Sequence, residues 1–202
     1  IALRTGATIQ ARNDQIYQIF KNWFNDLASS DQDIEPILRD LLQAANYYAA
    51  FRLGRGVEGK LADALGQTRH LADTPAILMM RLFESHRESQ SLSERDFLEA
   101  IGLVESYLLR RAMCGLQTRG YWAIFAGLAK SLQQDASLQN LKVGFTRLSE
   151  SYKFPSNKEF ADALKAENVY RFHVCCHLLE RLKNADTVGA DLQQWEPLPP
   201  RA

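Results

Sequence analysis

The sequence predicts an all-α protein, an irregular multi-helix bundle of about nine helices, and three observations lead to this prediction. Apolar residues recur at intervals of three and four, the spacing that keeps them on one face of a helix. No stretch shows the sustained alternation with β-branched residues that is typical of a strand. Turn and capping residues interrupt the periodic stretches, as expected for helices joined by short connections.

The predicted organisation is a connector over residues 1–12, a helical domain over 13–184 and a linker over 185–202, with a candidate sub-boundary at 88–93. Within the helical domain, periodicity predicts helices near 13–28, 37–51, 57–71 and 168–182. Thr74 followed by Pro75 predicts the start of a further helix, because proline is favoured in a first turn.

Serine residues mark three more predicted helix starts. Ser93 with Asp96 resembles a capping box in which Asp replaces the usual Glu or Gln, and Ser156 with Glu159 is a full capping box. Ser137 is a candidate cap for the helix between them. Two breaks are predicted from glycines, one at 54–56 and one between 115 and 120.

The stretch from residue 96 to residue 130 is expected to form the centre of the fold. Four of its apolar residues share one helix face: Phe97, Ile101, Val104 and Leu108. Arg111 falls on the same stripe one turn further on. Because an unpaired buried guanidinium is costly, we expect Arg111 to pair with a carboxylate or to open onto a groove.

Composition bounds the class of protein. The 202 residues fit one large or two small domains, and a 46% hydrophobic content supports a folded core. Basic and acidic residues balance at 24 each, so bulk charge does not indicate a polyanion-binding protein. Three cysteines, two of them adjacent, are typical of reduced intracellular thiols, and no stretch reads as a membrane helix. We therefore expect a cytoplasmic protein without a membrane partner and, because the chain begins at Ile1, a piece of a longer protein.

One local feature is compatible with nucleic-acid binding. Between residues 106 and 134 the chain carries four basic residues and no acidic ones: Arg110, Arg111, Arg119 and Lys130. Tyr121 and Trp122 are interleaved with them, and such a basic-aromatic patch can hold phosphates and stack bases. The alternative is that Arg110 and Arg119 are solvated, Arg111 pairs with a carboxylate distant in sequence, and the aromatic rings belong to the core.

The strongest candidate for metal binding is the group His173, Cys176 and His177, because zinc accepts such ligands. The zincin pattern requires Glu directly after its first histidine, where this chain has Val174. We favour a packed helix with half-buried histidines and apolar thiols, and we expect no metal here. Asp31 and Asp33 are interpreted as caps, and we expect no catalytic residue in this chain.

An ordered set of motifs points to a known family. The set comprises Glu105-Ser106-Tyr107-Leu108-Leu109-Arg110-Arg111, Cys114-Gly115-Leu116, Thr118, Ile124-Phe125-Ala126, Phe154-Pro155-Ser156, Phe160, Tyr170 and Leu178-Leu179-Glu180-Arg181-Leu182. With these motifs the chain resembles, from about Ala45 to Leu182, the helical region of GmrSD-type restriction endonucleases, the modification-dependent (type IV) enzymes of bacterial anti-phage defence.

The resemblance implies a role between two active domains. Such proteins carry an N-terminal nucleotide-hydrolysing sensor domain with an Asp-Gly-Gln-Gln-Arg motif and a C-terminal HNH nuclease with a Glu-His-Ile-x-Pro motif. Neither motif occurs in this chain, so no catalytic residue carries over. The implied function is a non-catalytic scaffold that contacts its flanking domains. A contact with the DNA backbone is an additional role that the resemblance allows. The NTP and divalent metal would belong to the parent protein, with 185–202 leading toward the nuclease motif. The alternative is a helical protein–protein interaction module with no nucleic-acid role.

Overall fold

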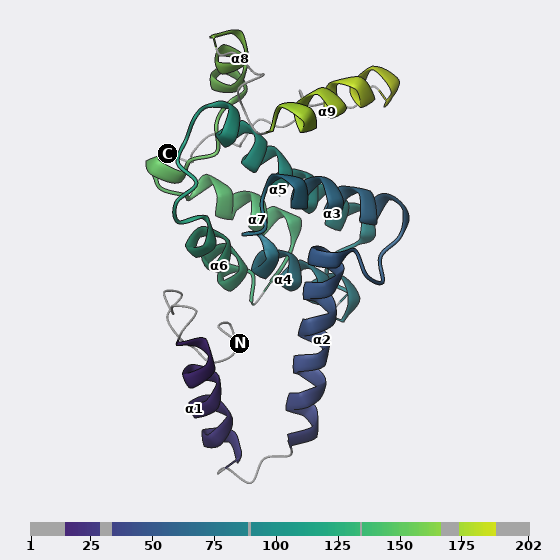
Figure 1. Cartoon of the computed structure of the whole chain (residues 1–202), viewed down its shortest axis with the longest axis vertical. Coiled ribbons are helices and arrows are strands. Elements are labelled where there is room, and N and C mark those ends of the chain that lie inside the picture. Colours follow the sequence, from purple (N-terminus) through teal and green to yellow (C-terminus); the bar gives the residue numbers. More distant parts are fainter. Residues whose placement is uncertain (1–14, 29–33, 89, 134, 167–173, 189–202) are drawn as a thin grey trace.

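The computed structural model describes residues 15–28, 34–88, 90–133, 135–166 and 174–188. Over these ranges the chain forms nine α-helices and no strand, which confirms the predicted all-α, multi-helix fold (Figure 1). The helices are α1 (Ile16–Ala28), α2 (Ile34–Leu53), α3 (Gly59–Leu71), α4 (Ala76–Arg87), α5 (Glu94–Met113), α6 (Tyr121–Ser131), α7 (Leu138–Thr146), α8 (Asn157–Ala166) and α9 (Cys175–Val188), with a short 3-10 turn at Glu150–Tyr152. The predicted connector 1–12 and the predicted caps Asp31 and Asp33 lie outside the described residues.

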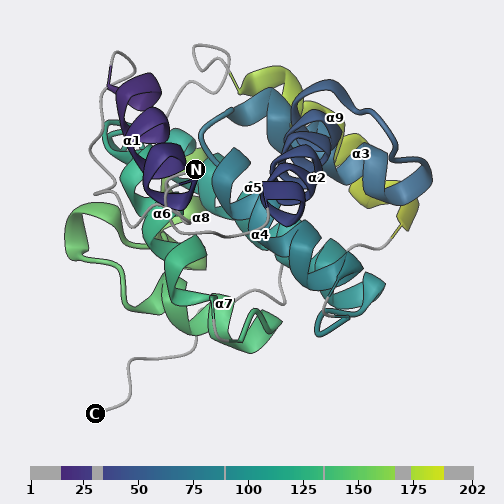
Figure 2. The same cartoon turned by 90° about the horizontal axis from the view of Figure 1, so that it is seen from below.

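α5 lies at the centre of the helical body and packs against α3, α4, α7 and α8. Seen from below, α4 and α5 lie between α3 on one side and α7 on the other (Figure 2). Phe97, Ile101, Val104 and Leu108 are all buried, as their spacing predicts. Residues on other faces of α5, such as Leu103 and Leu109, are buried as well, because neighbouring helices cover the helix on several sides.

The buried apolar side chains form two clusters. The larger one lies in the middle of the molecule and contains residues from the C-terminal half of α2 through α7. The smaller one joins the end of α5 to α9 and consists of Leu109, Met113, Val174 and Leu178. α9 is therefore attached to the body through its own small cluster rather than through the main core.

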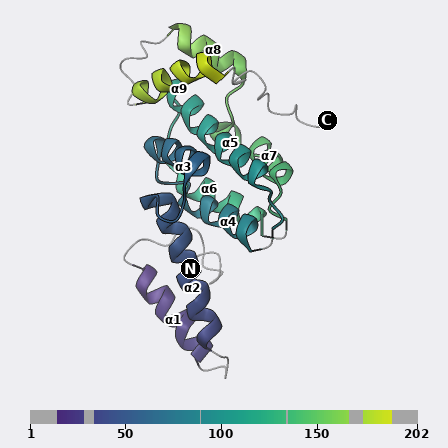
Figure 3. The same cartoon turned by 90° about the vertical axis from the view of Figure 1, so that its right-hand side faces the viewer.

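The two ends of the molecule differ from its middle. α1 and the first half of α2 project from one end of the helical body, and α8 and α9 lie at the opposite end (Figures 1 and 3). Only the C-terminal half of α2 enters the core, where Tyr47, Ala50 and Phe51 are buried.

The local helix signals are mostly confirmed. Ser93 Oγ accepts from the backbone N–H of Asp96 at 3.1 Å, and Ser137 Oγ accepts from that of Asn140 at 3.3 Å. Ser156 and Glu159 form the reciprocal capping box, with Glu159 Oε2 accepting from the Ser156 N–H at 2.8 Å. A hydrogen bond from Lys153 and then that from the Ser156 backbone lower the pKa of Glu159 to about 2.

Two boundary predictions are wrong. Thr74 does not cap α4: the helix begins at Ala76 behind Pro75, and the Thr74 hydroxyl is buried with no hydrogen-bond partner among the described residues. α9 continues to Val188, so the chain is still helical where the linker was predicted to begin at residue 185.

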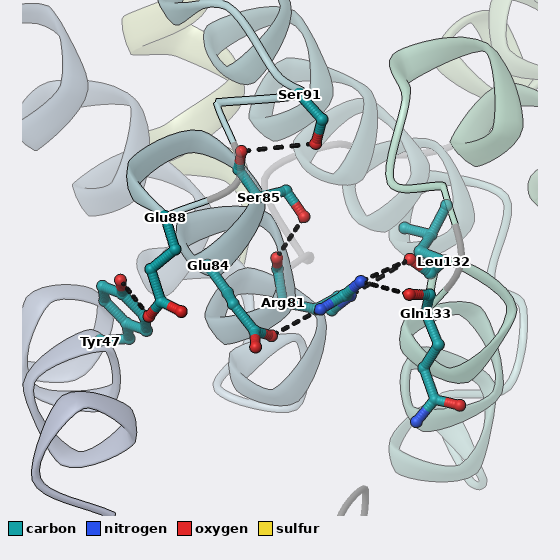
Figure 4. A network of polar contacts seen from close by, with 8 residues as sticks. All are labelled: Tyr47, Arg81, Glu84, Ser85, Glu88, Ser91, Leu132 and Gln133. Carbon is teal, nitrogen blue, oxygen red and sulfur yellow. Dashed lines mark hydrogen bonds and ion pairs between the residues drawn. The ribbon is translucent and has the colours of Figure 1, made fainter. Parts of the chain in front are cut away.

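An arginine joins α4 to the end of α6 (Figure 4). Arg81 donates through Nε and Nη2 to the carbonyl oxygen of Leu132 at 3.2 and 3.0 Å, and through Nη2 to that of Gln133 at 2.7 Å. Its Nη1 also binds Glu84 at 2.6 Å. A cation at carbonyls that have no helical partner satisfies them and favours the negative end of the helix dipole.

Gly120→Ala is expected to destabilise the protein by about 1–3 kcal/mol, because the position requires a left-handed backbone. Its φ is 90°, and an added Cβ would lie 2.5 Å from the Tyr152 hydroxyl oxygen. Gly127→Ala in α6 is the control: its Cβ would meet nothing within 4 Å, and alanine is the better helix former by about 1 kcal/mol. In chemical denaturation the free energy of unfolding should fall for Gly120→Ala and rise for Gly127→Ala. A Gly120→Ala variant as stable as the wild-type protein would contradict a required left-handed backbone at this position.

Candidate functional site

Arg111 is fully buried, at 0% exposure, and each of the three nitrogens of its guanidinium donates a hydrogen bond. Its Nε donates to the Tyr121 hydroxyl at 3.1 Å, and Nη1 donates to the Lys153 carbonyl at 3.0 Å. Nη2 donates to the carbonyls of Gln117 and Ser151 at 2.9 and 3.1 Å. The guanidinium also lies over three aromatic rings at 5.5–5.7 Å from their centroids: Tyr107, Tyr121 and Tyr152.

The expectation that Arg111 pairs with a carboxylate or opens onto a groove is therefore wrong. Within the described ranges its partners are three backbone carbonyls and one phenol. Such a cation is stabilised in the interior by carbonyl dipoles and ring faces instead of by a counter-charge. The arrangement joins α5 to the loop before α6 and to the 3-10 turn.

Arg110 is also an interior residue, at 3% exposure. Nη1 donates to the Pro155 carbonyl at 3.1 Å and Nη2 to Asn157 Oδ1 at 2.6 Å, so the guanidinium holds the segment that leads into α8. The rings of Phe154 and Phe160 lie 5.7 and 5.3 Å from it. Burial lowers the pKa of Arg110, which is the expected effect of removing a cation from water.

The structure divides the predicted basic patch into two parts. Arg110 and Arg111 face the interior and cannot reach a phosphate in this conformation, since their donors already bind protein acceptors. Arg119 and Lys130 are exposed at the start and the end of α6, and Trp122 is 42% exposed on the same helix. Of the four predicted basic residues, Arg119 and Lys130 are thus the two whose side chains could meet a nucleic acid.

The predicted metal candidates do not converge over the part that can be described. His177 is buried while the adjacent Cys176 is exposed, so the two side chains face different surroundings. His173 lies outside the described residues. Elsewhere in the described ranges, no group of three His, Cys, Asp or Glu side chains is arranged to hold a metal ion.

His177 belongs instead to a charged node that sequence reasoning did not identify. Glu105 of α5 is buried and accepts from His177 Nε2 at 2.8 Å and from Arg181 Nε at 2.6 Å, both on α9. Arg181 Nη2 contacts the second carboxylate oxygen, which completes a two-point pairing. Because an ionised carboxylate only accepts hydrogen bonds, Nε2 carries the imidazole proton.

The carboxyl group of this node is held in its ionised form. Burial by itself would raise the pKa of Glu105, but the hydrogen bonds from His177 and Arg181 outweigh that effect, and the pKa lies below its ordinary value. The pairing in turn raises the pKa of Arg181. One signal could have revealed the node: Glu105 is four residues from both Ile101 and Leu109, so a charged group sits in an apolar register.

A shallow groove lies between α6 and α7. Small and apolar side chains line most of it, including Ala123, Gly127, Leu128 and Val143, and Arg147 provides its cationic side chain. Among its lining residues, the groove brings together no acid, base and nucleophile.

The fold and these contacts define an all-α protein whose buried charges connect helices. No family model, curated protein or solved structure matches this chain. Over the described residues, none of the helices has the length and apolar character required to cross a bilayer.

Proposed function

We propose that this chain is the helical scaffold of a bacterial DNA restriction endonuclease of anti-phage defence, cytoplasmic and itself non-catalytic. It would position a nucleotide-hydrolysing domain and a nuclease domain of the same polypeptide. The observation that carries the proposal is a pair of exposed apolar surfaces at opposite ends of a tightly joined helical body.

The first surface, the α2 face, consists of Ile34, Leu38 and Leu42. Their spacing of four places them along one side of α2, and Leu38 and Leu42 are 54% and 64% exposed. This part of α2 projects from the body (Figure 3). Large apolar side chains in a row on a projecting helix are typical of a surface that another protein part covers.

The second surface, the α9 face, consists of Leu179 and Leu182, which are 45% and 47% exposed. They are three residues apart and therefore neighbours on the outer side of α9. The neighbouring part of the same apolar stripe packs on α5, because Leu178 lies four residues before Leu182 and is buried with Leu109 and Met113. The apolar stripe of α9 is thus bound to the body along one edge, and its other edge, Leu179 and Leu182, is available to a second domain.

The body between the two faces is held together by side-chain hydrogen bonds to the backbone of its loops. Arg81, Arg110 and Arg111 each donate to backbone carbonyls of segments distant in sequence, and Tyr107 donates to the Tyr152 carbonyl at 2.9 Å. Such side-chain ties to loop backbone restrict how helices move relative to one another. The NTP and the divalent metal would then belong to the flanking domains.

Contact with DNA backbone, if the scaffold makes it, would use Arg119 and Lys130. We expect binding of duplex DNA at low salt to weaken as salt rises, and Arg119→Ala or Lys130→Ala to reduce the magnitude of the log–log salt slope by about one. Fluorescence anisotropy over a salt series measures this slope. Arg95→Ala removes another exposed arginine, from the first turn of α5, and should leave the slope unchanged.

A second candidate function is a helical interaction module without any nucleic-acid role, which the same two apolar faces would favour. Absence of DNA binding at low salt would support that module over the DNA-contacting scaffold. Under either proposal, incubation of this chain with Mg²⁺ and modified DNA should give no cleavage, and robust cleavage would refute the non-catalytic assignment.

A further inference from the structure

We propose that α9 is a releasable arm, held against the body by one small apolar cluster and by the buried carboxylate of Glu105, so that its docking can be lost while the rest of the helical body stays folded. Such a device would control where the α9 face points. The proposal concerns contacts within this chain and holds whichever domains the α9 face would meet.

The first argument is the separation of the apolar clusters. Among its described side chains α9 contributes none to the main core, and its buried apolar contacts lie in the small cluster with Leu109 and Met113. Leu71 of α3 and two residues of α8, Phe160 and Leu164, pack against the same cluster. A cluster of this size stabilises an attachment far less than the main core stabilises the body, since apolar stabilisation follows the area buried. Local opening free energies differ across a protein for this reason.

The second argument is the convergence of the polar contacts on one acceptor. Over the described residues, the polar side-chain contacts from α9 to the body come from His177 and Arg181, and they end on the two oxygens of Glu105. Removing that carboxylate therefore leaves the Arg181 cation and the His177 ring without their partner at the same time. Loss of one member of a buried charged pair is strongly destabilising because the other member remains desolvated.

The third argument is that the node is incompletely satisfied when it is closed. His177 Nδ1 is buried and has no hydrogen-bond partner among the described residues. Release of α9 would return this nitrogen to water, and a buried polar atom without a partner favours that direction. Arg181 is about one third exposed, at 36%, so its guanidinium is already accessible from the solvent side.

The body, in contrast, keeps its own ties when α9 leaves. Arg110 holds the start of α8 through Pro155 and Asn157, and Arg111 holds the 3-10 turn. None of these contacts involves α9. The boundary between the arm and the body therefore lies between Asn157, the last residue held by Arg110, and the start of α9.

The test uses Cys175 as a reporter, because it is buried at the start of α9. Cys114→Ser and Cys176→Ser leave it as the only thiol of the chain, which has three cysteines. In this background, Glu105→Gln should raise the rate at which a thiol-reactive disulfide reagent modifies Cys175 by at least about tenfold. Amide exchange of α4 and of the first half of α5, measured in the same buffer, should change by less than about twofold.

The matched control is Glu99→Gln, on the same helix. Glu99 pairs with Lys142 of α7 at 2.9 Å, so this variant removes an α5 ion pair of the body and should leave the Cys175 rate unchanged. Arg181→Ala acts from the solvent side and should raise the Cys175 rate in the same direction as Glu105→Gln. The proposal is overturned if neither variant raises the Cys175 rate, or if core amide exchange rises in parallel with it.

Discussion

Replacing Arg111 with methionine is expected to lower the free energy of unfolding by about 4 kcal/mol, because buried acceptors left without donors cost about 1–3 kcal/mol each. The substitution keeps an apolar stem of similar length but removes every donor to the carbonyls of Gln117, Ser151 and Lys153. Those carbonyls belong to two separate loops, so the loss should loosen the junction of α5 with α6. Urea denaturation of the wild-type protein and of Arg111→Met, monitored by far-UV circular dichroism, gives the difference in their free energies of unfolding.

Arg111→Lys separates charge from geometry. A lysine retains the cation but cannot present the planar fork that reaches three carbonyls at once, so we expect it to recover less than half of the loss. Arg119→Ala removes an exposed arginine and should change stability by less than about 0.5 kcal/mol. If the free energy of unfolding of Arg111→Met lay within about 1 kcal/mol of the wild-type value, the buried guanidinium would not organise the loops.

Tyr107→Ala is expected to destabilise the protein by about 3–5 kcal/mol, the range for a large aromatic side chain removed from a packed core. Tyr107 is fully buried, and four aromatic rings lie around it with centroids at 5.0–6.0 Å: Tyr121, Phe125, Phe145 and Phe154. These rings come from α6, α7 and the segment before α8, so the resulting cavity would lie at the meeting point of three elements.

Tyr107→Phe is the matched variant. It keeps the ring and removes only the hydroxyl that donates to the Tyr152 carbonyl at 2.9 Å, so we expect a loss of about 1 kcal/mol. Thermal unfolding of Tyr107→Ala and Tyr107→Phe compares the stability lost with the whole ring to that lost with the hydroxyl alone. If the alanine and phenylalanine variants proved equally stable, the ring cluster would not be the centre of the packing.

The sequence was sufficient for the features that depend on neighbouring residues. Spacing of Phe97, Ile101, Val104 and Leu108 predicted the buried stripe of α5, and the serine caps at 93, 137 and 156 predicted three helix starts. Each of these signals is complete within one or two helical turns. Thr74 shows the limit of such signals, since its hydroxyl is buried behind Pro75 instead of capping the helix.

The buried charges could not be assigned from sequence because their partners are remote. Arg111 contacts the carbonyl of Ser151, and backbone carbonyls carry no residue-type signal at all. Glu105 meets His177 and Arg181 more than seventy positions further along the chain. Local spacing on α9 pointed to His177 as a metal candidate, whereas the folded chain brings it to a carboxylate of another helix.

The most direct test of the central claim, a joined helical body with a docking face at each end, is amide exchange measured on this chain alone and within its parent protein. The proposed function requires a longer protein that carries a Glu-His-Ile-x-Pro nuclease motif, and sequencing of the gene checks this. In that longer protein, peptides covering the α2 face and the α9 face should become more protected, while peptides of α4 and α5 stay unchanged. A parent protein in which both faces exchange as fast as in the isolated chain, or a reading frame that encodes neither flanking domain, would contradict the account.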